Sequence, residues 1–197
     1  MEPALALIEF SSIAVGIQAG DAMVKKAPIA SIKAGTVQPG KYLVLITGEV
    51  ADVEESLQAG IEWGAETVMD TVFLPQVHAA VVQAISGERV GGRGVALGVI
   101  ETDDVAATIQ AADAGVKGAE VTLREIRLAD GLGGKAFCLF QGEVQDVEAA
   151  VEIGIDFLPD PGVLVNLVVI PQLHEEMGDN LLTSSYFAER LGREKGW

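Results

Sequence analysis

The side chains best suited to metal or redox chemistry are scarce in this sequence. It contains two histidines, His78 and His174, and a single cysteine, Cys138. One cysteine excludes an internal disulfide and any multi-cysteine metal site within one chain. One histidine in each half, with no cysteine pattern nearby, falls short of zinc-ligand spacing. We therefore predict no metal site, and we expect the histidines at an interface or on a helix surface. Cys138 lies in a predicted strand, residues 136–140, and is expected to be a buried, inert core residue.

Carboxylates are abundant, but their pattern does not indicate catalysis. The pairs Glu54-Glu55 and Asp103-Asp104 fall at helix starts or on exposed faces. An active site needs a nucleophile with its base, carboxylates paired in a cleft, or a metal set. No phosphate-binding Walker loop, Gly-x-Ser-x-Gly motif or His-Cys pairing occurs. We predict that the chain is not an enzyme.

The overall charge excludes two classes of partner. The 197 residues carry a net charge of −16. Binding to nucleic acid or to an anionic membrane requires a basic surface, so neither is expected. Apolar runs such as residues 42–46 are too short to span a bilayer, and no basic signal-peptide segment follows Met1. We expect a soluble, cytoplasmic protein.

The sequence repeats itself. Three blocks recur in the same order, with seven of nine residues identical in the first pair and six of seven in the second. The matched blocks are Ile17–Lys25 with Ile109–Lys117, Gly48–Glu54 with Gly142–Glu148, and Pro75–His78 with Pro171–His174. The offset grows from 92 to 94 to 96, which places two short insertions in the second copy. This pattern indicates a tandem duplication.

The duplication predicts two domains and a tail. A Gly-rich, polar stretch at residues 86–94 has the composition of a linker. We therefore assign residues 1–88 to the first domain, 95–183 to the second and 184–197 to a C-terminal tail.

The pattern of apolar and turn residues in each copy predicts the order β-α-β-β-α-β, followed by a short helix. Ser11 or Ser12 could cap the first helix, and Asp103 its counterpart in the second copy. The expected elements of the first copy are a strand at 5–10, a helix carrying Ile13, Ile17, Gly20 and Val24, strands at 29–37 and 42–47, a helix carrying Val50, Val53, Leu57 and Ile61, a strand at 67–74 and a helix from Pro75. The small residue at Gly20 would let the first helix lie close to a sheet. The predicted fold class is α/β, more narrowly an α+β ferredoxin-like arrangement, with an antiparallel sheet and helices on one face.

These features together resemble the shell domain of bacterial microcompartments, twice over nearly the whole chain. The resemblance is carried by Ile8-Glu9 and Ile100-Glu101, the Asp-Ala-x-Val-Lys segments, the Gly-Lys after the central turn, the start of the second helix and Pro-x-x-His after the last strand. Because each copy begins with the Ile-Glu strand, the order is similar to that of the unpermuted tandem type.

The resemblance implies a structural shell protein that forms a homotrimer, a pseudohexamer of six lobes, and assembles with other shell proteins. In the family, the turn before Gly-Lys lines a central pore. Carried across by motif position, the pore-lining residues are Gln38, Pro39 and Gly40 of the first copy, alternating with Gly131, Leu132 and Gly133 of the second. Exposed amides in such turns would offer hydrogen-bond donors to small polar metabolites.

The resemblance also bears on cofactors and on contacts between tiles. Some trimeric relatives carry a cysteine in place of Gln38, and three of these cysteines hold an iron–sulfur cluster. Because glutamine is a poor cluster ligand, we predict no iron–sulfur cluster and no other cofactor here. Lys25 and Lys117 match lysines that relatives place at the tile edge. Gln76 and Gln172 stand where the family often has arginine.

A different class of function is left open by the sequence. Tandem ferredoxin-like domains can also bind small effectors at their interfaces. A ligand-sensing module of this kind would bind one metabolite saturably and would not assemble into sheets.

Overall fold

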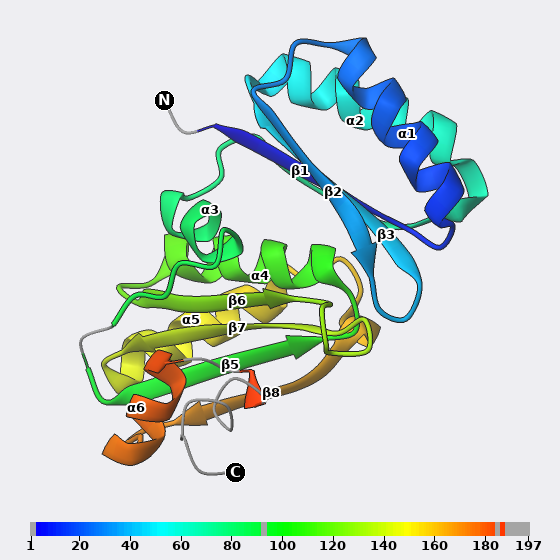
Figure 1. Ribbon diagram of the computed structural model, residues 1–197. Coiled ribbons are helices and arrows are strands. Elements are labelled where there is room, and N and C mark those ends of the chain that lie inside the picture. The colour runs from blue at the N-terminus through cyan, green and yellow to red at the C-terminus, as the bar shows by residue number, and fades with distance from the viewer. Residues whose placement is uncertain (1–2, 92–93, 184–185, 188–197) are drawn as a thin grey trace.

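The computed structural model describes residues 3–91, 94–183 and 186–187, in which one α/β unit occurs twice (Figure 1). The first copy contains β1 (Ala4–Phe10), α1 (Ile13–Lys26), β2 (Ser31–Val37), β3 (Lys41–Gly48), α2 (Val50–Gly64), a 3-10 turn (Ala65–Thr67), β4 (Val68–Leu74) and α3 (Ala79–Ile85). The second copy contains β5 (Ala96–Thr102), α4 (Val105–Gly118), β6 (Thr122–Leu128), β7 (Ala136–Gly142), α5 (Val144–Asp156), a 3-10 turn (Pro161–Val163), β8 (Leu164–Ile170) and α6 (Glu175–Thr183).

Each copy forms a four-stranded sheet in which all neighbouring strands are antiparallel. The strand orders are β2-β3-β1-β4 and β6-β7-β5-β8. This is the predicted ferredoxin-like arrangement, because β3 lies between β1 and β2 and splits the first β-α-β unit. The fold class inferred from the sequence is confirmed.

One face of the first sheet is covered by α1 and α2 of the same copy. Phe10 of β1 and Met23 of α1 are completely buried there. Helix α1 lies close to the sheet at Gly16, where an added Cβ would lie 2.7 Å from the ring of Tyr42. Gly20, at which the sequence predicted close packing, is also buried.

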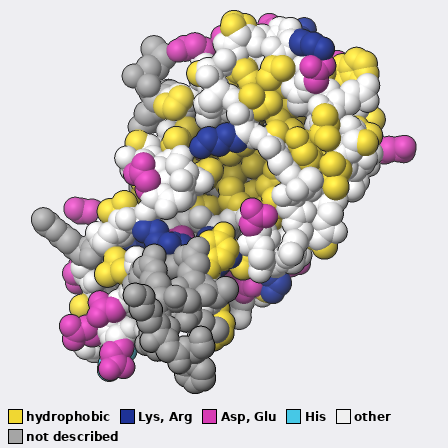
Figure 2. Space-filling view, in the orientation of Figure 1, with side chains coloured by type: hydrophobic (Ala, Val, Ile, Leu, Met, Phe, Trp, Pro, Cys, Tyr) yellow, Lys and Arg dark blue, Asp and Glu magenta, His cyan; other side chains and the backbone are white. Residues whose placement is uncertain are grey.

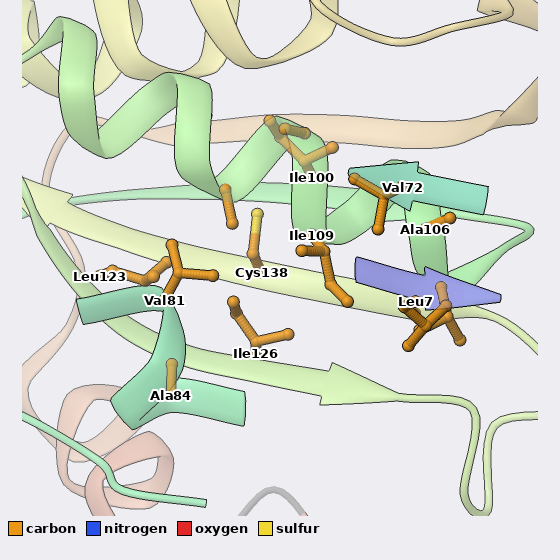
Figure 3. Packing of buried hydrophobic residues seen from close by; sticks show 14 of the residues in the cluster. Leu7, Val72, Val81, Ala84, Ile100, Ala106, Ile109, Leu123, Ile126 and Cys138 are labelled. Carbon is orange, nitrogen blue, oxygen red and sulfur yellow. The ribbon is translucent and has the colours of Figure 1, made fainter. Parts of the chain in front are cut away.

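The opposite face of the first sheet is covered by the second copy. Leu7 of β1 and Val72 of β4 share one buried cluster with Ala106 and Ile109 of α4 (Figure 3). In return, α3 of the first copy packs on β6 of the second. Cys138 belongs to the same cluster, and its complete burial raises the pKa of the thiol to about 12. It is the buried core cysteine that the sequence predicted.

The predicted cap of α4 is wrong by one residue. Asp104, not Asp103, is the N-cap, and its Oδ1 accepts a hydrogen bond from the backbone N–H of Ala107 at 2.6 Å. Asp103 is held in the preceding loop because its own N–H donates to the carbonyl of Val163. In the first copy Ser12 is the cap, as expected.

The last helix of each copy begins four residues later than predicted. Pro75 lies in a turn, and α3 starts only after His78, whose Nδ1 accepts from the N–H of Ala80 at 3.2 Å. The chain cannot coil earlier because the N–H of Val77 donates to the carbonyl of Pro3, which holds this segment against the start of β1. In the second copy α6 likewise begins at Glu175 instead of Pro171.

Candidate functional site

The two turns predicted to line a pore are tight and exposed. In the first, the N–H of Gly40 donates to the carbonyl of Val37 at 2.9 Å, and Gly40 adopts a φ of +110°. In the second, the N–H of Leu132 donates to the carbonyl of Ala129 at 2.9 Å. Leu132 is half-buried, whereas Gln38, Pro39, Gly40, Gly131 and Gly133 are exposed.

The structure brings these turns together. A Cβ added to Gly134, beside the second turn, would lie 3.1 Å from Cδ of Pro39 and 3.4 Å from the carbonyl oxygen of Gln38. The predicted residues of both copies therefore form one surface, although they are about ninety positions apart in the sequence. None of the six carries a charge, three of them are glycines, and only Gln38 has a polar side chain.

A buried carboxylate joins the two copies at the start of α4. Glu9, at the end of β1, is completely buried, and its Oε1 accepts from the N–H groups of Val105 at 2.6 Å and Ala106 at 3.1 Å. Its Oε2 accepts from Nζ of Lys41 at 3.2 Å. A carboxylate is stabilised at this position because the unpaired N–H groups and the helix dipole make a helix N-terminus positive.

A second polar contact joins the copies at the other end of α4. Asp113 accepts from the backbone N–H of His78 at 2.8 Å and from Nζ of Lys117 at 2.6 Å. Lys117 also donates to the carbonyl of Gln76. Thus Lys117, predicted at a tile edge, lies at the junction of the copies with 40 % of its side chain exposed. Lys25 is 72 % exposed on the surface; the tile-edge role of both lysines stays a prediction.

Acidic groups crowd together at this junction. Burial and the nearby carboxylates of Asp70 and Glu9 raise the pKa of Asp104 to about 7, although the hydrogen bond from Ala107 opposes the shift. The sequence pattern places Asp104 at a helix start but gives no sign of this cluster. Its members come from different copies, so no spacing in the sequence could have revealed it.

Equivalent helices of the two copies differ sharply in burial. On α1, the side chains of Ile13, Ile17 and Val24 are 39 %, 54 % and 41 % exposed, respectively. Their counterparts Val105 and Ile109 on α4 are completely buried, because the first sheet covers them. An apolar face of α1 is therefore without a neighbour in the single chain.

Two further surfaces are open in the same way. In the first sheet, one face is covered by α4. The same face of the second sheet is uncovered in the described part of the chain and contains a groove of about 300 Å³, lined mainly by apolar side chains. The lining residues are Leu97, Val99, Glu101, Phe137, Leu139, Ile170, Leu173, Met177 and Leu181. In addition, β2 is largely exposed, whereas its counterpart β6 is mostly buried. Figure 2 shows hydrophobic side chains gathered over the face that carries β2 and β3.

Within the described ranges, no group of three or more His, Cys, Asp and Glu side chains is placed to hold a metal ion. His78 lies at the junction of the copies, and an interface was one of the two locations expected for the histidines. His174 is exposed. Of the helices in the described part of the chain, none is both long and apolar enough to cross a membrane.

The comparison with known families agrees with this geometry. The BMC domain matches the chain twice, at residues 4–77 and 96–173. The chain belongs to the BMC-domain family. Both matches fall on the units seen in the structure, so this is a tandem BMC-domain chain.

Individual relatives of this BMC-domain chain cover one or both copies. The bacterial microcompartment shell protein PduT of Citrobacter freundii is 39 % identical over 177 residues, which are 90 % of this chain and 96 % of PduT. The shell protein EutM of Salmonella typhimurium is 37 % identical over 82 residues, 42 % of this chain and 83 % of EutM. A solved microcompartment protein from Desulfitobacterium hafniense DCB is 42 % identical, with a TM-score of 0.81, and covers 91 % of this chain and 99 % of that one.

Proposed function

We propose that this protein is a structural component of a bacterial microcompartment shell in the cytoplasm, where it forms homotrimeric tiles that assemble with other shell proteins. Membership of the BMC-domain family and the similarity to PduT over nearly the whole of both chains support the shell role. The proposed role is structural and requires no catalytic residue.

The trimer is supported by two exposed surfaces. The contact between the copies pairs a helix of one copy with a sheet of the other, and each chain has one more helix face and one more sheet face of the same kind that nothing in its described residues covers. Within the chain, α4 packs on the first sheet. The exposed apolar face of α1 and the apolar groove on the second sheet are these two surfaces. Docking α1 of one chain into the groove of the next would cover both surfaces, which is favourable because apolar area leaves water. Three such head-to-tail contacts close a ring of six lobes.

The same ring would place the paired turns around its axis. Gln38, Pro39 and Gly40 would then alternate with Gly131, Leu132 and Gly133 around a central pore for small polar molecules. Gln38 offers an amide instead of a thiolate, so we propose a pore without an iron–sulfur cluster. Lys25 and Lys117 are proposed to face neighbouring tiles at the rim.

The alternative role of a ligand-sensing module is less well supported. The apolar groove that could hold a metabolite is the counterpart of a surface that a helix fills elsewhere in the same chain. A helix of a second chain is therefore its better-matched occupant.

The first test is the native mass of the full chain over a wide range of concentrations. A species of about 62 kDa, three times the chain mass of 20.6 kDa, is expected at every concentration used. A monomer or dimer throughout would refute the tile. If the trimer forms, mixing it with a single-domain shell protein should give sheets by electron microscopy, and Lys25→Ala with Lys117→Ala should weaken the sheets in samples whose native mass is still that of the trimer.

A further inference from the structure

The contact between the copies is held at a fixed register by two carboxylates. Glu9 binds the first N–H groups of α4, and Asp113, near the far end of the same helix, binds the N–H of His78. Apolar packing between them has no strong directional preference, whereas hydrogen bonds to backbone N–H groups fix position and orientation. The two carboxylates therefore decide where along the sheet the helix lies.

Both carboxylates have counterparts that make no such contact in the single chain. The counterpart of Glu9 is Glu101, whose carboxylate accepts from Nζ of Lys135 at 2.9 Å and whose side chain is 36 % exposed. The counterpart of Asp113 is Asp21, which is paired with Lys25 and is 58 % exposed. For comparison, the side chains of Glu9 and Asp113 are 0 % and 5 % exposed.

The backbone N–H groups that would donate hydrogen bonds to Glu101 and Asp21 are also available. Val105 and Ala106 correspond to Ile13 and Ala14 at the start of α1, and His78 corresponds to His174. In the described part of the chain, none of these three N–H groups donates to a side chain. Ser12 caps α1 by accepting from Val15, which leaves the first two N–H groups of the helix open.

We infer that Glu101 and Asp21 are the residues that set the register between chains. Glu101 of one chain accepts hydrogen bonds from the N–H groups of the partner's Ile13 and the partner's Ala14. The partner's Asp21 accepts from the N–H of His174 at the other end of the same helix. This inference rests on the proposed trimer and adds to it the polar contacts that select a second copy of this chain, in one orientation, for the apolar groove.

The chemistry of these contacts agrees with the local charges. Lys135 lies beside Glu101 as Lys41 lies beside Glu9, and Lys25 lies beside Asp21 as Lys117 lies beside Asp113. Each carboxylate thus keeps a cation on one oxygen while the other is free to accept from backbone N–H groups. Charge-assisted bonds of this kind are stronger than bonds between neutral groups.

The test uses the full chain with Glu101→Ala, Asp21→Ala and both together. Matched controls are Glu148→Ala and Asp156→Ala, which remove exposed carboxylates from α5. The measured quantity is the concentration at which half the chains are trimeric, from mass photometry at dilutions that extend below the range of the native-mass test. Each interface variant should raise it by at least about tenfold, and the double variant further, because each removes a hydrogen-bonded charge at a buried contact. The controls should leave it unchanged.

Circular dichroism of the same samples tests whether a variant loses the trimer only because its fold is disturbed. Because Glu101 and Asp21 are partly exposed, their variants should keep the secondary structure of the wild type. If the wild type is trimeric and the interface variants match the controls, the inference is wrong while the trimer stands. If the wild type is not trimeric at any concentration, both the proposed function and the inference fail.

Discussion

The carboxyl groups of Asp104 and Asp70 interact across the junction of the two copies. Asp104 is the N-cap of α4, and Asp70 lies on β4 of the first copy. Burial is the main cause of the rise in the pKa of Asp104 from 3.8 to about 7, and the negative charges of Asp70 and Glu9 add to it. A carboxyl whose pKa is raised by folding stabilises the folded state most when it is protonated. That contribution is complete below pH 3.8 and is lost as the pH rises through about 7.

The first prediction is that Asp104→Asn removes this pH dependence. Asparagine caps a helix about as well as aspartate, so the bond to Ala107 can be kept without the charge. The melting temperature of the variant should exceed that of the wild type by roughly 2–4 °C at pH 8. The gap should grow from pH 5 to pH 7 and stay constant above that. Asp103→Asn is the control, since that neighbouring side chain is exposed. An equal gap at every pH would contradict the assignment.

The second prediction concerns the exposed face of α1. Ile17→Glu should convert the trimer to a monomer, because the proposed contact would bury a carboxylate in an apolar groove. The single chain should stay folded, since Ile17 is 54 % exposed there. Phe157→Glu is a matched control at an equally exposed apolar residue, 58 % accessible, that lies outside the open surfaces. Native mass and circular dichroism give the answer, and a persisting Ile17→Glu trimer would place the chain contact elsewhere.

The third prediction compares two glycines with positive φ. At Gly94, with φ +96°, an added Cβ would lie 2.2 Å from the carbonyl oxygen of Gly142, whereas at Gly40 nothing lies within 4 Å. Gly40→Ala should therefore cost only the strain of the left-handed backbone, about 1–2 kcal/mol of unfolding free energy. Gly94→Ala adds a collision with backbone and should cost at least about 3 kcal/mol. Urea unfolding measures both, and similar values would show that the entry to β5 can shift.

The fourth prediction tests where Gln38 lies. If three copies of this residue face one another around an axis, Gln38→Cys should bind an iron–sulfur cluster after anaerobic reconstitution, at one cluster per trimer. The wild type should bind none, because its single thiol, Cys138, is buried. Gln38→Ser is the control for altered turn structure. Absorbance and iron content provide the measurement; a variant that forms the trimer but takes up no iron would argue against three cysteines within reach of one cluster.

The internal repeat made most of the fold predictable, because matched blocks confirm one another's elements. The burial of α1 was not predictable in this way. Its Ile17–Lys25 segment is nearly identical to Ile109–Lys117 in α4, yet one helix has an exposed face and the other is buried on both sides. Burial depends on which copy lies next to the helix, and the pattern within a helix does not contain that information.

Errors at helix starts have a similar cause. Asp103 and Asp104 are equally good caps by residue type, and only the structure distinguishes them, because Asp104 accepts from Ala107 while the N–H of Asp103 donates to Val163. The sequence likewise indicated the turns around Gln38 and Leu132, but their adjacency results from packing of one copy on the other. The candidate site could thus be named residue by residue from the family pattern, while its contacts across the copies could not.

The repulsive pair Asp104 and Asp70 occurs only where the copies share one chain. At the corresponding positions for a contact between chains stand Ser12 and Asn166, which are uncharged. A covalent connection gives the two copies a high effective concentration for one another, so their contact tolerates an unfavourable interaction. Separate chains must find each other by diffusion and lack that help. In the proposed trimer, the contact between the two copies of one chain is therefore less constrained than the contact between chains.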